Sequence, residues 1–198
     1  MVIHYGDGLT QAQKDKQQAM LDKLPDAAKE RLRETGTKIW VGRRADETPG
    51  WADLAKETGW TSTDTIADGR QLGSLSFYVG HRNELYISVD YPGGSVNVYT
   101  HELGHAIDYQ WTGDGRLISD DVEWQSLHNT HIKNNPNIDS YYRGGPSGTN
   151  DASGRKELFA EGYAIYNAYG RAALVGWVKD EAVADQIIAI WKRYGVVK

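Results

Sequence analysis

The first seventy residues combine a helical pattern with a short strand and a long polar segment. The spacing of apolar positions predicts a helix over residues 10–35, and Pro25 predicts an interruption within it, because proline lacks the backbone N–H that a helix interior needs. Residues 38–41 contain isoleucine, tryptophan and valine in succession, which indicates a strand. Residues 42–70 are rich in Gly, Asp and Thr, so we expect a long polar loop there.

The pattern changes from strands to helices near residue 94. Residues 74–79 and 84–89 are rich in β-branched and aromatic side chains and are joined by a four-residue turn, which predicts an antiparallel pair. The sequence therefore predicts an α+β fold in which a small, mostly antiparallel sheet lobe packs against a helical lobe. We expect one domain over residues 1–198, with lobes of about 1–93 and 94–198. The helices expected in the second lobe begin near residue 95 and span about 121–133, 155–169 and 181–194.

Composition is that of a folded protein without a nucleic-acid partner. A chain of 198 residues can bury about 70% of its unfolded surface. Its 39% hydrophobic residues and seven tryptophans support a packed core rather than disorder. The net charge of −5 argues against nucleic-acid binding, which depends on basic surface. We expect a monomer.

The chain offers no cysteine and no targeting signal that would fix its compartment. The absence of cysteine excludes disulfides and thiolate metal sites. The N-terminal residues lack a basic segment followed by an apolar stretch, so no signal peptide is predicted, and no later run is long enough for a membrane span. The sequence therefore assigns no compartment: the protein is either exported or a cytosolic or phage-borne gene product.

The segment His101-Glu102-Leu103-Gly104-His105 carries the clearest chemistry of the sequence. On a helix, residues four apart share one face, so the rings of His101 and His105 can converge on one metal ion. This spacing is typical of catalytic zinc sites, in which a carboxylate such as that of Glu102 takes a proton from water whose pKa the metal lowers. We expect the helix to start after a turn at residues 91–95, with Ser95 as N-cap, and to be half buried through an apolar stripe (Val96, Val98, Leu103, Ala106, Ile107).

Zinc needs a third protein ligand, which must be acidic or a more distant histidine. Position 111 is tryptophan, which excludes a third histidine six residues after His105, and the chain has no cysteine. Glu157 is the best candidate, because it lies in a second helical segment with Glu161 one turn further on. One of these carboxylates can bind the metal while the other accepts a hydrogen bond from a ligating imidazole.

Two segments together resemble a known family. His101-Glu102-Leu103-Gly104-His105-Ala106-Ile107-Asp108, followed by Glu157-Leu158-Phe159-Ala160-Glu161, resembles the catalytic domain of anthrax lethal factor and of the secreted Pro-Pro endopeptidases, which are zinc endopeptidases. The resemblance covers roughly residues 70–170. It implies one zinc ion per chain, bound by His101, His105 and Glu157, with Glu102 as general base and Glu161 holding a ligand from behind.

A weaker similarity extends to the strand on which such enzymes bind peptides. Residues 72–79 resemble this edge strand, and the resemblance implies substrate-binding residues Gly73, Ser74, Leu75, Ser76 and Phe77.

The chain departs from the family at the residue that stabilises the oxyanion. The family has a tyrosine seven residues before the glutamate ligand, and that position here is Asn150. A glycine-rich insertion follows two tyrosines upstream, so we expect Tyr142 to supply the hydroxyl, with Tyr141 as second choice. The alternative is that both tyrosines pack the loop.

A competing third ligand comes from a four-residue similarity. Gly148-Thr149-Asn150-Asp151 resembles the segment of the aspzincins, another class of zinc endopeptidase, in which the aspartate binds zinc. The match ends there, because Gly154 and Arg155 stand where tyrosine and glycine are expected. Asp151 stays an alternative to Glu157.

The sequence therefore predicts a zinc-dependent endopeptidase that acts on a peptide or protein. The resemblance implies a zincin-like form of the α+β fold, with the zinc site between the sheet lobe and the helical lobe. The alternative is a catalytically inactive zincin-fold module that binds a protein partner. The remaining histidines are not expected to be ligands: His128 and His131 are predicted at the surface, and His4 and His81 have no partner at useful spacing.

Overall fold

The computed structural model describes residues 1–91 and 93–197 and contains a four-stranded mixed sheet. The strand order is β1-β2-β4-β3. Strands β1 and β2 are parallel, as are β2 and β4, and β3 is antiparallel to β4 at the edge. The strands are β1 (Ile3–Tyr5), β2 (Lys38–Gly42), β3 (Phe77–Val79) and β4 (Glu84–Ser88).

The prediction of a mostly antiparallel sheet is wrong, although the predicted β3–β4 pair is confirmed. Two long-range pairings make the sheet mixed. Strand β1 has only three residues, too few for a visible alternation, and β4 pairs with β2 after a connection of about forty residues. Local pattern cannot predict such pairings.

Helices cover both faces of the sheet. Strand β4 is buried throughout: Leu85 and Ile87 face the main core and Tyr86 faces a second apolar cluster. The second cluster includes Leu54 of α3 (Trp51–Thr58), a helix inside the segment predicted as a loop. Leu54 is the buried residue of helix α3, so the helix has no repeating apolar pattern by which the sequence could have revealed it.

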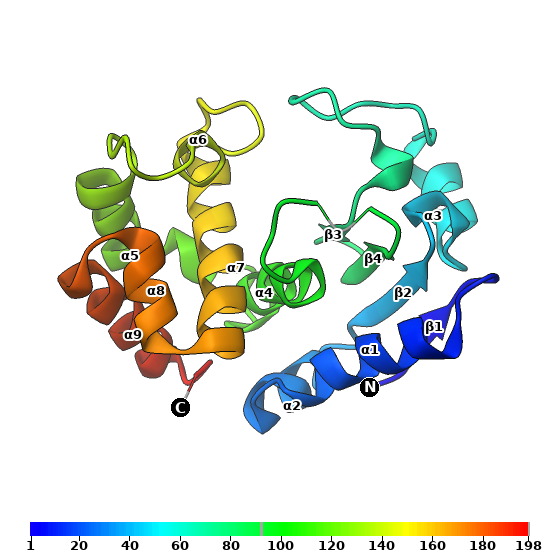
Figure 1. Cartoon of the computed structure of the whole chain (residues 1–198), viewed down its shortest axis with the longest axis horizontal. Coiled ribbons are helices and arrows are strands. Elements are labelled where there is room, and N and C mark those ends of the chain that lie inside the picture. Colours follow the sequence, from blue (N-terminus) through cyan, green and yellow to red (C-terminus); the bar gives the residue numbers. More distant parts are fainter. Residues whose placement is uncertain (92, 198) are drawn as a thin grey trace.

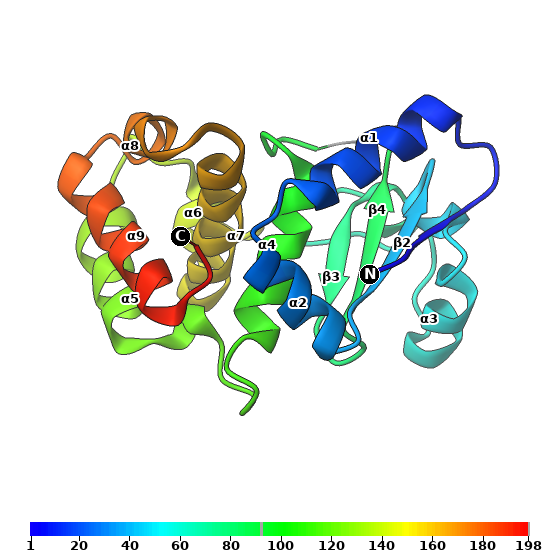
Figure 2. The same ribbon diagram turned by 90° about the horizontal axis from the view of Figure 1, so that it is seen from below.

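The first helical segment is confirmed with its break. Helices α1 (Gln11–Asp22) and α2 (Asp26–Glu34) are separated at Pro25, which occupies the N-cap position of α2. Thr10 caps α1 reciprocally with Gln13, which fixes where the helix starts. Both helices lie across the sheet beside α4 (Figure 2).

Helix α4 (Val98–Gln110) lies between the sheet and the C-terminal helices (Figure 1). Asn97 caps it by accepting a hydrogen bond from the Thr100 N–H, so the N-cap expected at Ser95 was two residues early. The turn expected before it includes Pro92, which lies outside the described residues. Most residues of the helix are buried, rather than the expected half, because other elements pack on both sides of it. Val96, which was expected in the apolar stripe, precedes the helix and is 48% exposed.

The segment after α4 is helical, as predicted, with two helices that the sequence did not reveal. The predicted 121–133 helix is α5 followed by one π turn over His128–Ile132. The predicted 155–169 helix starts four residues earlier, and the 181–194 helix is confirmed. The unexpected helices are α6 and α8. The helices are α5 (Val122–Leu127), α6 (Ser140–Gly144), α7 (Asp151–Tyr169), α8 (Arg171–Val178) and α9 (Glu181–Tyr194), with short 3-10 turns at Ala45–Glu47, Leu72–Ser74 and Ile118–Asp120.

Aromatic side chains fill the core of the C-terminal helices. Trp124 and Trp191 are fully buried, with ring centroids 6.1 Å apart, and both contact Phe159 of α7. This packing fixes α7 against α5 and α9. Within the described residues, no helix is both long and apolar enough to span a membrane.

Candidate active site

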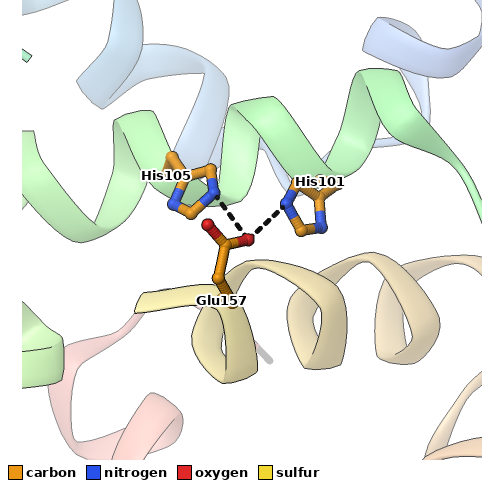
Figure 3. Close-up of side chains that lie close together, drawn as sticks. All are labelled: His101, His105 and Glu157. Carbon is orange, nitrogen blue, oxygen red and sulfur yellow. Dashed lines mark hydrogen bonds and ion pairs between the residues drawn. The ribbon is translucent and has the colours of Figure 1, made fainter. Parts of the chain in front are cut away.

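Helices α4 and α7 bring two histidines and one glutamate together (Figure 3). One nitrogen of His101, one nitrogen of His105 and one oxygen of Glu157 all lie within 4.8 Å of one another. Glu157 Oε2 is 3.1 Å from His101 Nε2 and 3.4 Å from His105 Nε2. The spacing of the histidines and the choice of Glu157 as their partner therefore agree with the geometry.

A close crossing of α4 and α7 makes this convergence possible. A side chain at Gly104 would place its Cβ 2.9 Å from the Ala160 Cα, which is closer than van der Waals contact. Gly104 lies between the two histidines, and Ala160 lies between Glu157 and Glu161. The two smallest residue types, glycine and alanine, thus lie where the helices touch, and the functional side chains lie on either side of this contact.

Glu161 holds His101 from behind. Its Oε2 accepts hydrogen bonds from His101 Nδ1 at 2.8 Å and from the Ser95 hydroxyl at 2.6 Å, and its Oε1 accepts one from the Val96 N–H at 3.0 Å. The carboxylate is 2% exposed, so these bonds are shielded from water. With Nδ1 donating to Glu161, His101 Nε2 faces Glu157, and loss of the Nε2 proton would leave this nitrogen free to bind a metal. Ser95 is the member of this group that the sequence did not reveal.

Glu102 lies beside the ligand cluster with its carboxylate 5% exposed at the wall of the cleft. Burial raises the pKa of this carboxyl, while the charges of His101 and His105 act in the opposite direction. A carboxylate with a raised pKa is a better base near neutral pH than an exposed one.

The charges of the cluster fit a bound cation. Three carboxylates, of Glu102, Glu157 and Glu161, surround one pair of imidazoles in a largely buried position, where Glu157 and His105 are the more exposed members. Burial opposes ionisation of His101, but hydrogen bonds to Glu157 and Glu161 outweigh it and raise the pKa to about 10. Burial likewise opposes ionisation of Glu157, yet the two imidazoles hold its pKa well below the usual range. The site thus favours positive charge, and two imidazoles with one carboxylate form a known catalytic zinc donor set.

A cleft of about 570 Å³ opens onto these side chains. Its walls come from α4, α6 and α7 and from the edge strand β3 with the residues before it. Of the five predicted substrate-binding residues, Leu75, Ser76 and Phe77 line the cleft. Gly73 is buried against Asp46 and Ser62, and Ser74 does not line the cleft.

Both candidate tyrosines lie on α6 and line the cleft. Burial and the charges of Glu157 and Glu102 raise the pKa of Tyr141. Burial and the charges of Glu161 and Glu157 raise the pKa of Tyr142. The Tyr142 ring packs edge-on against Trp177, with centroids 5.0 Å apart. The charges that act on Tyr141 thus include those of Glu157 and Glu102, whereas the Tyr142 ring is packed against Trp177.

Asn150 and Asp151, at the start of α7, have other partners. Asn150, which stands where the family has a tyrosine, caps the helix by accepting a hydrogen bond from the Ser153 N–H at 3.0 Å. Asp151 pairs with Lys133 and is not part of the ligand cluster.

The structure places two further residues, His128 and Arg70, differently from what the sequence predicted. The expectation that His128 is a surface residue is wrong: it is fully buried, and its Nε2 donates to the Tyr142 carbonyl at 3.2 Å, whereas His131 is exposed. Arg70, in the segment predicted as a polar loop, lines the cleft and lies 5.7 Å from the ring centroid of Tyr141. No sequence signal marked Arg70, because its contact depends on two segments seventy residues apart.

The chain shares its fold with a solved structure of the Pro-Pro endopeptidase PPEP-2 from Paenibacillus alvei. The superposition has a TM-score of 0.65 and covers 95% of this chain and 96% of that one, at 16% sequence identity. No family profile matches the sequence, and no curated protein matches it. The similarity in fold thus extends well beyond residues 70–170, where the sequence resemblance was confined.

Proposed function

We propose that this protein is a zinc-dependent endopeptidase. The observation that carries the proposal is the convergence of His101, His105 and Glu157 in a cleft, with the buried Glu102 carboxylate beside them. The fold supports it, because the solved structure that shares it is an endopeptidase by name. The open edge of β3 along the cleft is a second support, since extended peptides bind by adding a strand to such an edge.

His101, His105 and Glu157 would hold the zinc ion, and Glu161 would keep His101 in the tautomer that binds it. When bound, zinc supplies a Lewis acid that polarises the scissile carbonyl and lowers the pKa of water. Glu102 then takes a proton from the attacking water and delivers it to the nitrogen of the leaving amine. Its raised pKa suits both steps, because it must first accept and then release this proton.

A tyrosine hydroxyl would stabilise the negative charge that develops on the carbonyl oxygen. We assign this role to Tyr141 and place Tyr142 second, because the surroundings of the Tyr141 hydroxyl include both Glu157 and Glu102. The raised pKa keeps the phenol protonated at neutral pH, as a hydrogen-bond donor must be. One donor of this kind contributes about 3 kcal/mol to lowering the barrier.

The peptide would lie along β3, where its main chain would pair with the free edge. Leu75 and Phe77 then offer apolar contacts to its side chains, since both line the cleft. The Ser76 hydroxyl accepts a hydrogen bond from the Ser88 N–H at 2.9 Å, so this side chain stabilises the end of β4.

Zinc content and peptide cleavage test the proposal together. We expect one zinc per chain in the wild type, little zinc in Glu157→Ala and unchanged zinc in Asp151→Ala, with cleavage of a diverse peptide library that a chelator abolishes. Loss of zinc in Asp151→Ala but not in Glu157→Ala would refute the ligand assignment. Full zinc without cleavage of any peptide would refute the peptidase and favour a zincin-fold module that binds a partner.

A further inference from the structure

One arginine and one lysine line the cleft among the residues that the structure describes, and they differ in their partners. The guanidinium of Arg70 is neutralised by Asp68, which accepts two hydrogen bonds from it at 2.9 and 2.6 Å. The ammonium of Lys156 contacts a neutral phenol, donating to the Tyr109 hydroxyl at 3.0 Å. Over residues 1–91 and 93–197, no carboxylate forms an ion pair with Lys156.

Lys156 is held at a defined place in the cleft wall. It precedes the ligand Glu157 on α7, and its Nζ lies 5.2 Å from the ring centroid of Tyr109 on α4. The Tyr109 ring packs edge-on against Tyr78 of β3, with centroids 5.4 Å apart. It also lies against Gly80, where a Cβ would be 2.7 Å from the ring. The ammonium thus contacts Tyr109, whose ring is itself held in place by Tyr78.

A peptide paired with the edge of β3 would pass beside this position. Tyr78 belongs to that edge strand and lines the cleft together with Tyr109 and Lys156. A peptide paired with the edge of β3 would direct alternate side chains toward this wall, because side chains alternate along a strand. Lys156 is half-buried, so an ion pair formed there would be partly shielded from solvent.

We propose that Lys156 forms a subsite for an acidic side chain of the substrate, so that the enzyme prefers peptides with Asp or Glu near the scissile bond. The inference rests on the proposed peptidase function and adds a substrate class to it. The competing interpretation is that Lys156 only balances the charge of Glu102 and Glu157, in which case its loss would affect all peptides alike.

A charge-reversal experiment separates the two interpretations. Peptide libraries are prepared in which one position at a time is Asp, Asn or Lys. We expect the wild type to cleave peptides with Asp at one position about fivefold faster in kcat/KM than those with Asn, which corresponds to about 1 kcal/mol. Lys156→Arg should keep the preference, Lys156→Met should abolish it, and Lys156→Glu should shift it to Lys.

Two controls keep the result specific to this side chain. Lys192→Glu makes the same charge change on an exposed position of α9 and should leave the preference unchanged. Zinc content is measured for every variant, because Lys156 adjoins a ligand. The proposal would be overturned if Lys156→Met lowered kcat/KM equally for the Asp, Asn and Lys peptides, or if its preference for Asp survived.

Binding distinguishes failure of this proposal from failure of the proposed function. The same Asp and Asn peptides are titrated into zinc-loaded Glu102→Gln, with Lys156 or with Met at position 156. Tighter binding of the Asp peptide that depends on Lys156 supports the subsite even if no peptide is cleaved. Equal binding of both peptides overturns it even if cleavage is observed.

Discussion

Asp108 and Glu161 are both buried carboxylates near the ligand cluster, but their partners differ. Glu161 accepts three hydrogen bonds, whereas the Asp108 Oδ1 accepts one from the Ser119 N–H at 2.7 Å and the Oδ2 has no partner. Burial therefore raises the pKa of Asp108 to about 6, although the hydrogen bond from the Ser119 N–H acts against this. The pKa of Glu161 is lowered by its donors despite burial.

The raised pKa of Asp108 predicts a pH-dependent cost to stability. The folded protein binds this proton more tightly than the unfolded chain, whose pKa is 3.8. The free energy of unfolding therefore falls as pH rises from about 4 to about 6, by about 3 kcal/mol in total. Asn cannot ionise, and its side-chain oxygen can still accept a hydrogen bond from the Ser119 N–H. The free energy of unfolding of Asp108→Asn should therefore increase relative to that of the wild type as pH rises across this window. Urea unfolding in chelator from pH 4 to 8 measures the difference, and a pH-independent difference would contradict it.

The bond from His101 to Glu161 predicts how zinc affinity depends on a residue that does not touch the metal. Glu161→Gln keeps the shape but weakens the hold on the His101 ring, because a neutral amide replaces a carboxylate. We expect zinc affinity to fall about 10- to 100-fold. Competition with a chromophoric chelator measures this, with the exposed Glu30→Gln as matched control. Equal affinity of the two variants would show that Glu161 does not position the ligand.

The two tyrosines of α6 predict a difference between two conservative variants. Tyr141→Phe should lower kcat about 100-fold or more, because it removes the donor to the oxyanion. Tyr142→Phe should lower it much less, because the Phe ring keeps the contact with Trp177. Steady-state kinetics on one cleaved peptide decide between them, and the reverse order would return the role to Tyr142.

At the scale of elements, the crossing of α4 and α7 controls the geometry of the site. An alanine at position 104 gains about 1 kcal/mol of helix propensity over glycine. Its Cβ would, however, lie 2.9 Å from the Ala160 backbone, and forced overpacking costs about 1–3 kcal/mol. The cost of overpacking should exceed the gain in helix propensity, and the separation of the two helices should move Glu157 away from the histidines.

Two glycine variants test this crossing. Gly104→Ala should lower both the free energy of unfolding and the zinc affinity. Gly176→Ala, on an exposed part of α8 with no atom within 4 Å of the new Cβ, should raise the free energy of unfolding by up to about 1 kcal/mol. Denaturant unfolding and zinc competition provide the two readouts. An unchanged zinc affinity in Gly104→Ala would show that the helices separate without disturbing the ligands.

The elements that the sequence predicted well are those with a local cause. The break at Pro25, the hairpin of β3 and β4, and helix α4 each follow from residues within one segment. Strand β1, the parallel pairing of β2 with β4 and the short helix α6 depend on contacts between distant segments. The N-cap is Asn97 rather than Ser95, and the Ser95 hydroxyl donates to Glu161, sixty-six residues away, which no local pattern could predict.

At the scale of the whole molecule, the residues that line the cleft come from the sheet side of the molecule and from the C-terminal helices. Figure 1 shows how these two groups of elements are arranged on either side of α4. Arg70, from the loop before β3, reaches the Tyr141 ring on α6 and links the two sides of the cleft. The same division explains what could be predicted of the site. His101, His105, Glu102 and Glu157 carry local motifs, whereas the environment of Arg70 and of Lys156 exists only after the two sides have met.

Peptide cleavage by the wild type and by Glu102→Gln, at equal zinc content, tests the central claim most directly. Gln preserves the size of the buried side chain but cannot take a proton from water. We predict cleavage by the zinc-loaded wild type and a loss of about 100-fold or more in kcat for Glu102→Gln. Equal rates for the two proteins, or no cleavage by the wild type with one zinc per chain, would contradict the account.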